Sequence, residues 1–523
     1  MNTIKVKNIA ELKTRKGTPE TVVEVLGYVT EGDGGGGNFY WDNTSTTTED
    51  GGLVFSVSTV SVGRWKRIYE REVVLKWFNV IGDGVTDDTT NFQKAIDTVS
   101  TGASIILDSK ANYKVSSLNV TGKVLTFVGN NCKITSTGEN GAFYKTDHDN
   151  KLTVKNINFL GKIGIYHNSS PSETAYDELL IEECSFNVNS TYYGIKLIGT
   201  REPIILKCFF RNVNSGNGIY FKDVVSPFVN LCLFKGGGYV GRAIYYPGTG
   251  NGTDAGLIIR DTEIMGWDKG LEVVGCDWLN IEGSTIDYNN YSIKLGSQDG
   301  ANISGNYIGS LGANPALWIT SDAAASSPNY CDKITIINNT FTGHWVTDNT
   351  YDCILIDGAV YSDQLNITDN SFTFYTRNGI RFSTNAKLSI LNNSFAQRSG
   401  FGVAPIYNVL GTSDSGVTIK NNVFINATTI TALNVTFAKV NENIGCITEN
   451  NGQYFAGSGV STYSITHGLS YTPAAKDIQF SCANLECASR TPYLISTDAT
   501  SIVVGFATAT TAVTSGMWRV RRG

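Results

Sequence analysis

The sequence has few of the residues that would indicate a metal, a nucleic acid or a membrane. Only 4 of its 523 residues are histidine and 10 are cysteine, and no group of them has the spacing of zinc ligands. The 41 basic residues are outnumbered by 47 acidic ones, which argues against a nucleic-acid partner. No apolar run approaches the roughly 18 residues of a membrane span. We therefore expect no metal, no cofactor, no nucleic acid and no membrane insertion.

The beginning of the chain also lacks an export signal. Residues 1–10 contain no apolar core of the kind found in signal peptides, so we expect synthesis without Sec export. A chain of this length can bury a large core, and its length is typical of about three domains.

What the sequence does contain is one pattern of apolar residues, repeated eleven times between Leu152 and Phe424. Each copy has an apolar residue, another two positions on, a small or Asn-like residue three further on, and Phe or Ile two beyond that. The mean period is about 26 residues, which is typical of a solenoid. The copies begin at Leu152, Leu179, Pro203, Pro227, Leu257, Leu279, Ala301, Ile334, Leu365, Leu388 and Val417.

The spacing within each copy indicates strands rather than helices. Apolar and polar residues alternate with a period of two, and the alternation is interrupted at one bend. A second alternating segment follows, such as Ile195 with Leu197 or Ile293 with Leu295. Short strands that each pair with the same strand one turn later form a coiled parallel sheet around stacked side chains. The sequence therefore predicts an all-β fold, a parallel β-helix.

One position of the repeat is polar or small in ten of the eleven copies, the exception being Ile157. Cys184, Cys208 and Cys232 occupy it in three consecutive turns, where we interpret them as small apolar fillers in a reducing compartment. In later turns, we expect a ladder of inward amides that satisfies backbone groups at a tight corner. Its members are Asn306, Asn339, Asn370, Asn393 and Asn422. The spacing of Cys482 and Cys487 leaves a pairing between them open.

The first 70 residues have a different composition. The glycine run in Gly32–Asp42 is not followed by Gly-Lys-Ser/Thr, so it is interpreted as a turn between short strands and not as a phosphate loop. Further on, Thr86 or Asp87 is expected to cap a helix that covers the open end of the β-helix. The apolar face of that helix is Phe92, Ala95, Ile96 and Val99. Capping explains the nearby aspartates more simply than calcium binding does.

At these residues, the chain resembles the tailspike proteins of tailed bacteriophages that have a pectate-lyase-like β-helix. The resemblance rests on Gly32–Asp42, Gly63–Arg67, Gly82–Thr89 and the coils, and covers most of the chain. It implies a homotrimer whose right-handed parallel β-helix solenoid binds, and usually cleaves, a bacterial surface polysaccharide such as capsule or O-antigen. It also implies a location in the virion tail after synthesis in the cytoplasm of the host bacterium.

The resemblance also implies an organisation into domains. Residues 1–70 would attach the chain to a phage baseplate or tail protein. Residues 71–450 would form the β-helix with the glycan site, with the capping helix in 71–110. Residues 451–523 would be a small β-rich domain for trimerisation or carbohydrate binding, which fits the alternation in Ser501–Phe506.

A candidate glycan surface follows from the second strand of each turn. The residue after each inward Ile or Leu points outward, and these residues stack about 4.8 Å apart. In order they are Lys196, Tyr220, Tyr245, Glu272, Lys294, Trp318, Leu355, Arg381 and Tyr407. Aromatic faces stack on sugar rings, and charged groups bind hydroxyls and carboxylates. The predicted substrate-binding residues are Tyr220, Tyr245, Lys294, Trp318, Asp357 and Arg381. An ordinary exposed or subunit-facing sheet is the alternative.

Acidic residues are frequent near the middle of this row. Asp277, Asp299 and Asp322 follow the inward residues of their strands by five or six positions, so they are expected to stack at one corner. Glycosidic hydrolysis needs two carboxyl groups, about 5–9.5 Å apart. The predicted catalytic residues are Glu272 with Asp299 or Asp322. Asp357, Asp261 and Glu263 are reserves, and a neighbouring subunit could supply one of the acids.

Three functional classes remain open from the sequence. An endoglycosidase is favoured because carboxylates surround the aromatic row. A polysaccharide lyase would use a base such as Lys294, Arg381, His344 or Tyr245. A spike that binds its receptor without cleaving it is the third class.

Overall fold

The computed structural model describes most of the chain, which forms two compact units that we treat separately. The first unit extends to Asp268, and the second begins at Lys269. The described residues are 4–171, 177–189, 191–248, 254–311, 314–321, 331–343, 350–357, 364–383, 387–398, 404–408, 416–425, 439–445, 449–469 and 472–521. Within them the fold is almost entirely β, and its three α-helices are α1 (Ile9–Leu12), α2 (Thr89–Thr98) and α3 (Leu485–Arg490).

A five-stranded sheet forms the start of the first unit, with strand order β1-β2-β3-β5-β4. Its strands are β1 (Ile4–Val6), β2 (Val22–Val25), β3 (Gly37–Asp42), β4 (Val54–Ser56) and β5 (Arg64–Arg67). The glycine run lies between β2 and β3, where the Asp33 carboxylate accepts backbone N–H groups of Tyr28, Val29, Thr30 and Gly35. The predicted turn is confirmed.

Helix α2 buries the predicted apolar face, including Phe92, Ala95 and Ile96. The N-cap position is Asp88, while the carboxylate of the predicted Asp87 accepts the backbone N–H of Thr89, the first residue of the helix, at 2.9 Å. The Asp88 carboxylate does not cap the helix. Instead it accepts the backbone N–H groups of Ile81 at 2.7 Å and Gly82 at 3.0 Å, since the preceding loop has no strand partner for them.

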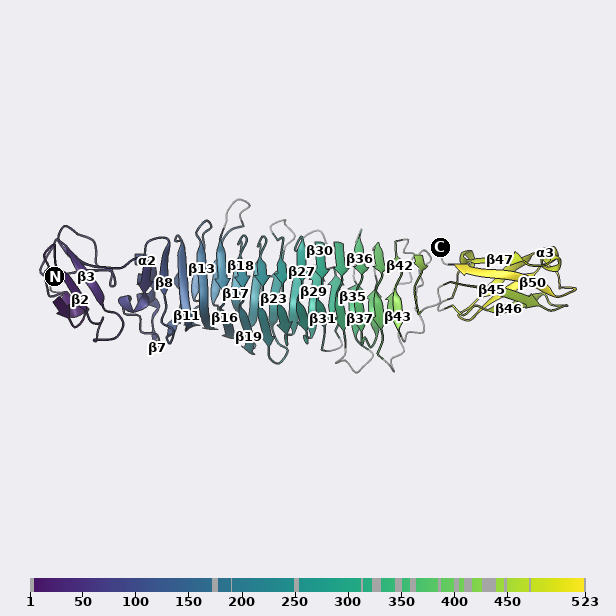
Figure 1. Ribbon diagram of the computed structural model, residues 1–523, viewed down its shortest axis with the longest axis horizontal. Helices are drawn as coiled ribbons and strands as arrows, with labels where there is room; N and C mark the ends of the chain where they lie inside the picture. Colours follow the sequence, from purple (N-terminus) through teal and green to yellow (C-terminus); the bar gives the residue numbers. More distant parts are fainter. Residues whose placement is uncertain are drawn as a thin grey trace. The chain divides into compact units, whose positions relative to one another are not determined.

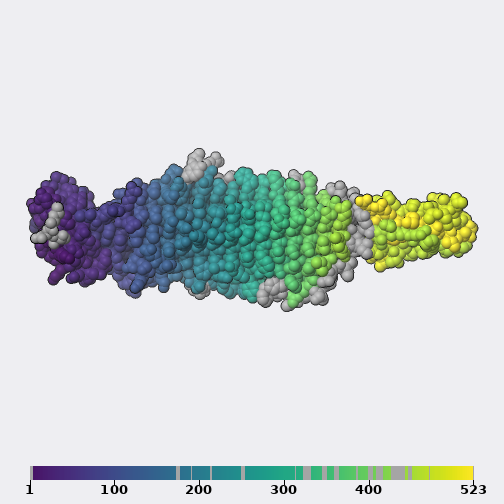
Figure 2. Space-filling view, viewed as in Figure 1, coloured from purple at the N-terminus to yellow at the C-terminus, as the bar shows by residue number. Residues whose placement is uncertain are grey.

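The predicted parallel β-helix is confirmed. In the first unit, strands of one coil pair in parallel with those of the next, as in β15–β18, β16–β19 and β17–β20 (Figure 1). Ile195 lies in register with Ile219, and Phe186 with Phe210, so equivalent positions of the repeat stack. These coils follow one another as bands from blue to teal in the space-filling view (Figure 2).

The strands of the first unit's coils are β6 (Glu72–Val74), β7 (Asp83–Asp87), β8 (Ala103–Ile106), β9 (Asn112–Val115), β10 (Leu118–Asn119), β11 (Leu125–Ser136), β12 (Phe143–Lys145), β13 (Leu152–Gly161), β14 (Ile165–Asn168), β15 (Leu179–Glu182), β16 (Ser185–Asn189), β17 (Tyr193–Ile198), β18 (Ile204–Leu206), β19 (Phe209–Asn214), β20 (Asn217–Lys222), β21 (Phe228–Asn230), β22 (Leu233–Gly236), β23 (Arg242–Pro247), β24 (Ile258–Arg260) and β25 (Glu263–Met265).

The second unit continues the same pattern of coils. Its coil strands are β26 (Lys269–Val274), β27 (Leu279–Glu282), β28 (Thr285–Asp287), β29 (Tyr291–Gly296), β30 (Asp299–Ser304), β31 (Tyr307–Gly309), β32 (Leu317–Thr320), β33 (Asp332–Ile337), β34 (Thr340–Thr342), β35 (Asp352–Asp357), β36 (Leu365–Thr368), β37 (Ser371–Thr373), β38 (Asn378–Phe382), β39 (Leu388–Leu391), β40 (Ser394–Ala396), β41 (Ile406–Asn408), β42 (Thr418–Lys420), β43 (Val423–Ile425) and β44 (Lys439–Asn441).

The interior is filled by identical side chains on successive coils. The Phe159, Phe186 and Phe210 rings stack with centroids 5.1 and 4.9 Å apart. In the second unit, Phe372 and Phe395 stack at 4.6 Å. Such stacks are possible because each coil repeats the previous one at the spacing of paired strands.

The predicted asparagine ladder is confirmed and longer than expected. Asn339 shows the pattern: its Nδ2 donates to the Ile303 carbonyl at 2.8 Å and to Asn370 Oδ1 at 3.0 Å. Its Oδ1 accepts from the backbone N–H of Asn306 at 2.9 Å. The ladder continues to Asn443, which the repeat pattern missed because Gly445 follows it where Phe or Ile is expected.

The residue before each ladder position has a left-handed backbone, which makes the corner of the coil. Asn338, Asp369 and Asn392 have φ values of 56°, 55° and 56° there. Asn, Asp and Gly tolerate this conformation better than other residues, which explains why Asn-Asn and Asp-Asn pairs recur in the repeat.

All nine described cysteines are free thiols, and eight of them are buried. Cys184, Cys208 and Cys232 fill the ladder position in three coils, as predicted. The open question of Cys482 and Cys487 is also answered, because both are free and do not form a disulfide.

The last part of the second unit contains two three-stranded sheets, with orders β45-β50-β47 and β46-β49-β48. Their strands are β45 (Glu449–Ala456), β46 (Thr462–Thr466), β47 (Ile478–Cys482), β48 (Pro492–Thr497), β49 (Ser501–Phe506) and β50 (Thr514–Arg521). A buried cluster that includes Tyr454, Ile502 and Trp518 forms their common core. Among the described residues, no helix combines the length and apolar character needed to cross a membrane.

A buried histidine gives the first unit a pH-dependent stability. Burial lowers the pKa of His167 to about 4, although Asp177 opposes this effect. Nearby lie Lys145, Asp147 and His148, and His167 Nε2 is 3.0 Å from the Asp147 carbonyl oxygen. Because the folded pKa is below the unfolded value of about 6.5, this contribution to stability is complete above pH 6.5 and is lost as the pH falls through 4.

We expect His167 to reduce the free energy of unfolding by about 3 kcal/mol between pH 7 and pH 4. Thermal melts of the wild type and of His167→Gln at both pH values would measure it. The glutamine variant cannot take up the proton, so its loss of melting temperature on acidification should be smaller. An equal loss in both proteins would contradict the assignment.

Candidate functional site

In the first unit, the outward row predicted from the sequence lies in register on successive strands. Lys196 pairs with Tyr166 on one side and with Tyr220 on the other, and Tyr220 pairs with Tyr245. The Lys196 Nζ lies 4.7 Å from the Tyr166 ring centroid, and the Tyr220 and Tyr245 rings are 5.8 Å apart. The row begins earlier than expected, with Tyr144 and Tyr166. Tyr144 was missed because it precedes the first recognised copy, whereas Tyr166 follows the inward Ile165 within that copy's coil and could have been found by alternation.

In the second unit, the outward row also follows the predicted order. Glu272, Lys294, Trp318, Leu355 and Arg381 each lie in register with the next. Equivalent positions of the sheet therefore carry a carboxylate, an ammonium group, an indole and a guanidinium along one line.

Glu272 is buried and held by two ammonium groups. Its Oε1 is 2.9 Å from Lys269 Nζ and 3.3 Å from Lys294 Nζ. Two cations at this distance favour the ionised carboxylate, so Glu272 suits a positioning or electrostatic role better than that of a proton donor. Lys269 was missed, although it lies two residues before the inward Leu271 and pairs in register with Tyr291.

Trp318 is the centre of a second group in this row. Its indole Nε1 donates to Asp357 Oδ1 at 2.7 Å, and the Tyr291 ring stacks on it at 5.8 Å with an interplanar angle of 24°. Lys294 Nζ lies 5.2 Å from its ring centroid. The predicted residues Lys294, Trp318 and Asp357 are thus brought together. Tyr291 was missed, although it lies in the same strand as Lys294.

Arg381 lies further along the row, close to a buried acid. The Arg377 Nε donates to Asp352 Oδ1 at 2.9 Å and its Nη2 contacts Asp352 Oδ2, while Arg381 Nη1 stays 3.9 Å from that oxygen. Burial raises the pKa of Asp352, and the two arginines oppose this effect.

Two aspartates lie in register at the corner that follows the row strands. Asp299 is the first residue of β30, three residues after β29 ends, and it pairs with Asp332, the first residue of β33. Lys333 Nζ lies 3.0 Å from Asp299 Oδ1 and 3.7 Å from Asp332 Oδ2, so these oxygens are at most about 6.7 Å apart. This upper limit includes the carboxyl separation of about 5–5.5 Å that retaining glycoside hydrolases use.

The predicted third acid at this corner, Asp322, lies outside the described residues, as does His344. Asp332 was missed, although a signal for it exists. Asp277, Asp299 and Asp332 each stand two residues before the start of a repeat copy, at Leu279, Ala301 and Ile334. Asp332 would have been found from its position two residues before the copy that begins at Ile334. Asp322 was predicted instead from its position five residues after Leu317 in the preceding strand.

An exposed tryptophan lies beside the aspartate pair. The side chain of Trp278 is 73% exposed, and its φ is 58°, which is unusual for a bulky residue. Its backbone N–H donates to the Asp299 carbonyl at 3.0 Å. A Cβ on Gly300 would come within 3.1 Å of the indole, so the absence of a side chain there leaves room for it. The corner therefore offers an aromatic surface next to two carboxyl groups.

The predicted pairing of Glu272 with Asp299 differs from the arrangement observed. Glu272 is in a row strand and is bound by Lys269 and Lys294, whereas Asp299 starts the next part of the coil and is bound by Lys333. The register partner of Asp299 is Asp332.

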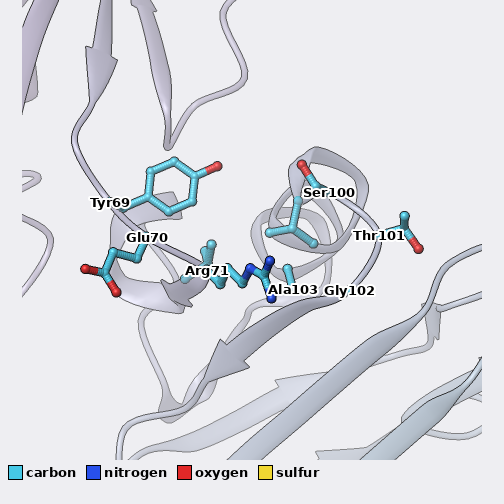
Figure 3. Close-up of a pocket in the computed structure, with 9 residues that line it drawn as sticks. Tyr69, Glu70, Arg71, Ser100, Thr101, Gly102 and Ala103 are labelled. Carbon is cyan, nitrogen blue, oxygen red and sulfur yellow. The ribbon is translucent and has the colours of Figure 1, made fainter.

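A cavity of about 410 Å³ lies elsewhere, in the first unit. It is bounded by the segment before β6 and by the loop after α2, and Figure 3 shows Arg71 extending towards that loop while the Glu70 carboxylate points away from it. None of the predicted site residues lines this cavity. In the described part of the chain, no cluster of three or more His, Cys, Asp and Glu side chains is arranged to hold a metal ion.

Comparison with known proteins identifies one domain directly. Residues 5–70 match the family model of the phage tail protein small four-stranded beta-sheet domain. The chain is also 36% identical over 119 residues to the Mu-like prophage FluMu defective tail fiber protein of Haemophilus influenzae. That match covers 22% of this chain and spans only 19% of the relative's length.

Similar solved structures include phage tailspike proteins. The tailspike protein of Escherichia coli bacteriophage HK620, in complex with a pentasaccharide, is 13% identical, with a TM-score of 0.49 over 90% of this chain and 98% of that one. The tailspike protein gp49 of Acinetobacter baumannii bacteriophage Fri1, a capsular polysaccharide depolymerase, is 11% identical, with a TM-score of 0.37 over 99% and 98%. These TM-scores are too low to decide what this chain does. The predicted resemblance is confirmed in the phage tail domain and the β-solenoid fold.

Proposed function

We propose that this chain is a phage tailspike that binds a bacterial surface polysaccharide, capsule or O-antigen, and depolymerises it by endoglycosidic hydrolysis. The observation that carries the proposal is the Asp299–Asp332 pair beside the exposed indole of Trp278. The pair stands at the corner next to a row of aromatic and charged residues, so a sugar chain bound along the row would have a bond within reach of two carboxyl groups.

The two aspartates would share the chemistry of hydrolysis. Asp332, whose side chain is 12% exposed, would serve as the general acid of the pair. Asp299 is 36% exposed and would act as the base or nucleophile. A separation of at most about 6.7 Å fits a retaining enzyme or the short end of the inverting range. Glu272, the other predicted acid, would act by holding Lys269 and Lys294 in the row.

The binding surface would be the row of the second unit, with Lys294, Trp318, Asp357 and Arg381 as contacts. Trp318 is oriented by Asp357 and supported by Tyr291, which fixes an aromatic face for a pyranose ring. Tyr220 and Tyr245 of the first unit would bind sugar in the same manner.

The match of residues 5–70 to a phage tail domain supports attachment of residues 1–70 to a baseplate or tail protein. Residues 71–450 would be the glycan-binding β-helix, and residues 451–523 would serve trimerisation or carbohydrate binding. A homotrimer in the virion tail is part of this proposal, as the resemblance implies.

The test is incubation of the purified chain with capsule and lipopolysaccharide from a panel of bacteria, followed by mass spectrometry of the released oligosaccharides. Products that have gained one water are expected. Products of β-elimination, which lack that water and absorb in the ultraviolet, would instead establish a lyase. Binding without release would leave a receptor-binding spike, and neither binding nor release from a susceptible strain would refute the proposal.

A further inference from the structure

Two buried carboxylates in the strands of the second unit's row each lie within 4 Å of two cationic groups. Lys269 and Lys294 share the Glu272 carboxylate, as described above. Arg377 and Arg381 share Asp352. This local balance differs from the chain as a whole, in which acidic residues exceed basic ones by 47 to 41.

Asp352 is fully occupied by one of its two arginines. Its side chain has no exposed surface, and the fork of Arg377 binds both of its oxygens. A bidentate arginine pair uses the carboxylate lone pairs that face it, which leaves Asp352 little capacity for a second guanidinium.

Arg381 is the cation that this arrangement leaves over. Its Nη1 is 3.9 Å from Asp352 Oδ2, beyond hydrogen-bond distance. Its Nε is buried and has no hydrogen-bond partner among the residues that the structure describes. A buried donor without a partner costs free energy unless a ligand satisfies it. The Arg381 side chain as a whole remains 29% exposed.

We propose that Arg381 binds the carboxylate of an acidic sugar, which makes the substrate an anionic polysaccharide built with uronic or similar carboxylated residues. This inference rests on the proposed function and names its substrate class. A planar guanidinium can donate two parallel hydrogen bonds to a carboxylate. Tyr407 follows Arg381 in register on the next strand, where its ring could support the same sugar.

The experiment measures binding of three small probes to the full chain by ligand-observed NMR titration: glucuronate, glucose and glucose 6-phosphate. We expect glucuronate to bind at least about 10-fold more tightly than glucose, since the charge-assisted pair is worth about 1.5–3 kcal/mol. Glucuronate should also bind at least as well as the phosphate ester. Equal binding of glucose and glucuronate, or a clear preference for the phosphate, would overturn the proposal.

Two substitutions then locate the site. Arg381→Gln should lower the affinity for glucuronate about 10-fold and that for glucose by a smaller factor. Arg381→Lys keeps the charge without the fork, so its affinity for glucuronate should lie between those of the wild type and Arg381→Gln. The matched control is Arg211→Gln, which removes an exposed guanidinium from β19 of the first unit and should have no effect. If Arg381→Gln retains full glucuronate affinity while its circular dichroism matches the wild type, Arg381 is not the site.

Failure of this inference is distinguishable from failure of the proposed function. If the chain releases oligosaccharides from a bacterial polysaccharide but does not bind glucuronate, the proposed function stands and the proposed role of Arg381 is refuted. A chain that binds glucuronate through Arg381 but cleaves no polysaccharide would retain the inference and lose the catalytic proposal.

Discussion

Replacing Asp332 with asparagine is expected to lower the rate of polysaccharide cleavage at least about 100-fold, with little change in binding. Asparagine has nearly the same shape as aspartate but cannot donate an acidic proton. Asp299→Asn should have a loss of similar size, because hydrolysis needs both carboxyl groups of the pair. Reducing-end assays of released oligosaccharide would measure the rate, and binding would be measured on intact polysaccharide.

The matched control for these substitutions is Asp369→Asn. Asp369 is an exposed aspartate of the same unit with a φ of 55°, a conformation that asparagine adopts readily. The chemical change is the same, but it lies away from the acid pair, so activity should stay at the wild-type level. If Asp332→Asn cleaves as fast as Asp369→Asn, the assignment of the pair is wrong. Loss in Asp299→Asn alone would point to a different partner for Asp299.

Removing one amide from the ladder is expected to destabilise the β-helix by about 3–5 kcal/mol. The Asn370 Nδ2 donates to the carbonyls of Ile336 and Thr368 at 2.9 Å each and to Asn393 Oδ1 at 3.0 Å. Its Oδ1 accepts from the backbone N–H of Asn339 at 2.9 Å. In Asn370→Ala, these buried groups would lose their partners without gaining water.

Denaturant unfolding of the full chain would measure this effect. Asn366→Ala is the control, because Asn366 lies in β36 of the same coil but is only half-buried. Asn370→Thr should lose less than the alanine variant, since Thr262 occupies the same position of another coil and its hydroxyl donates to the Arg260 carbonyl at 2.8 Å. Equal stabilities of Asn370→Ala and Asn366→Ala would contradict a structural role for the ladder.

Much of the fold could be predicted because each coil of a β-helix repeats the same pattern of inward and outward residues. Each copy places apolar residues at fixed intervals, so the positions of Phe186, Asn339 and Ile293 follow from counting. The ends of the solenoid were harder, since copies that lack a conserved residue are not recognised. The coil around Asn443 was missed because Gly445 stands where Phe or Ile is expected, and the coil around Cys132 because extra residues between Val128 and Cys132 break the spacing.

The start of α2 shows a different limit. Several adjacent residues can cap a helix, and the choice depends on which backbone groups elsewhere need an acceptor. Asp88 binds the N–H groups of Ile81 and Gly82, a requirement that is set by the path of the preceding loop. Local propensity gives the existence of the helix but not its first residue.

By itself, the sequence determined the period, the parallel β-helix, the buried ladder and the outward row, because side-chain direction in a strand depends only on alternation. Only the tertiary structure decided which charged groups meet. Asp332 lies opposite Asp299 because strands β30 and β33 pair in register. The loop between these strands sets how far apart the two residues are in the sequence. Likewise, the pairing of Glu272 with two lysines, and the closer approach of Arg377 than of Arg381 to Asp352, depend on the position of side-chain ends rather than on periodicity.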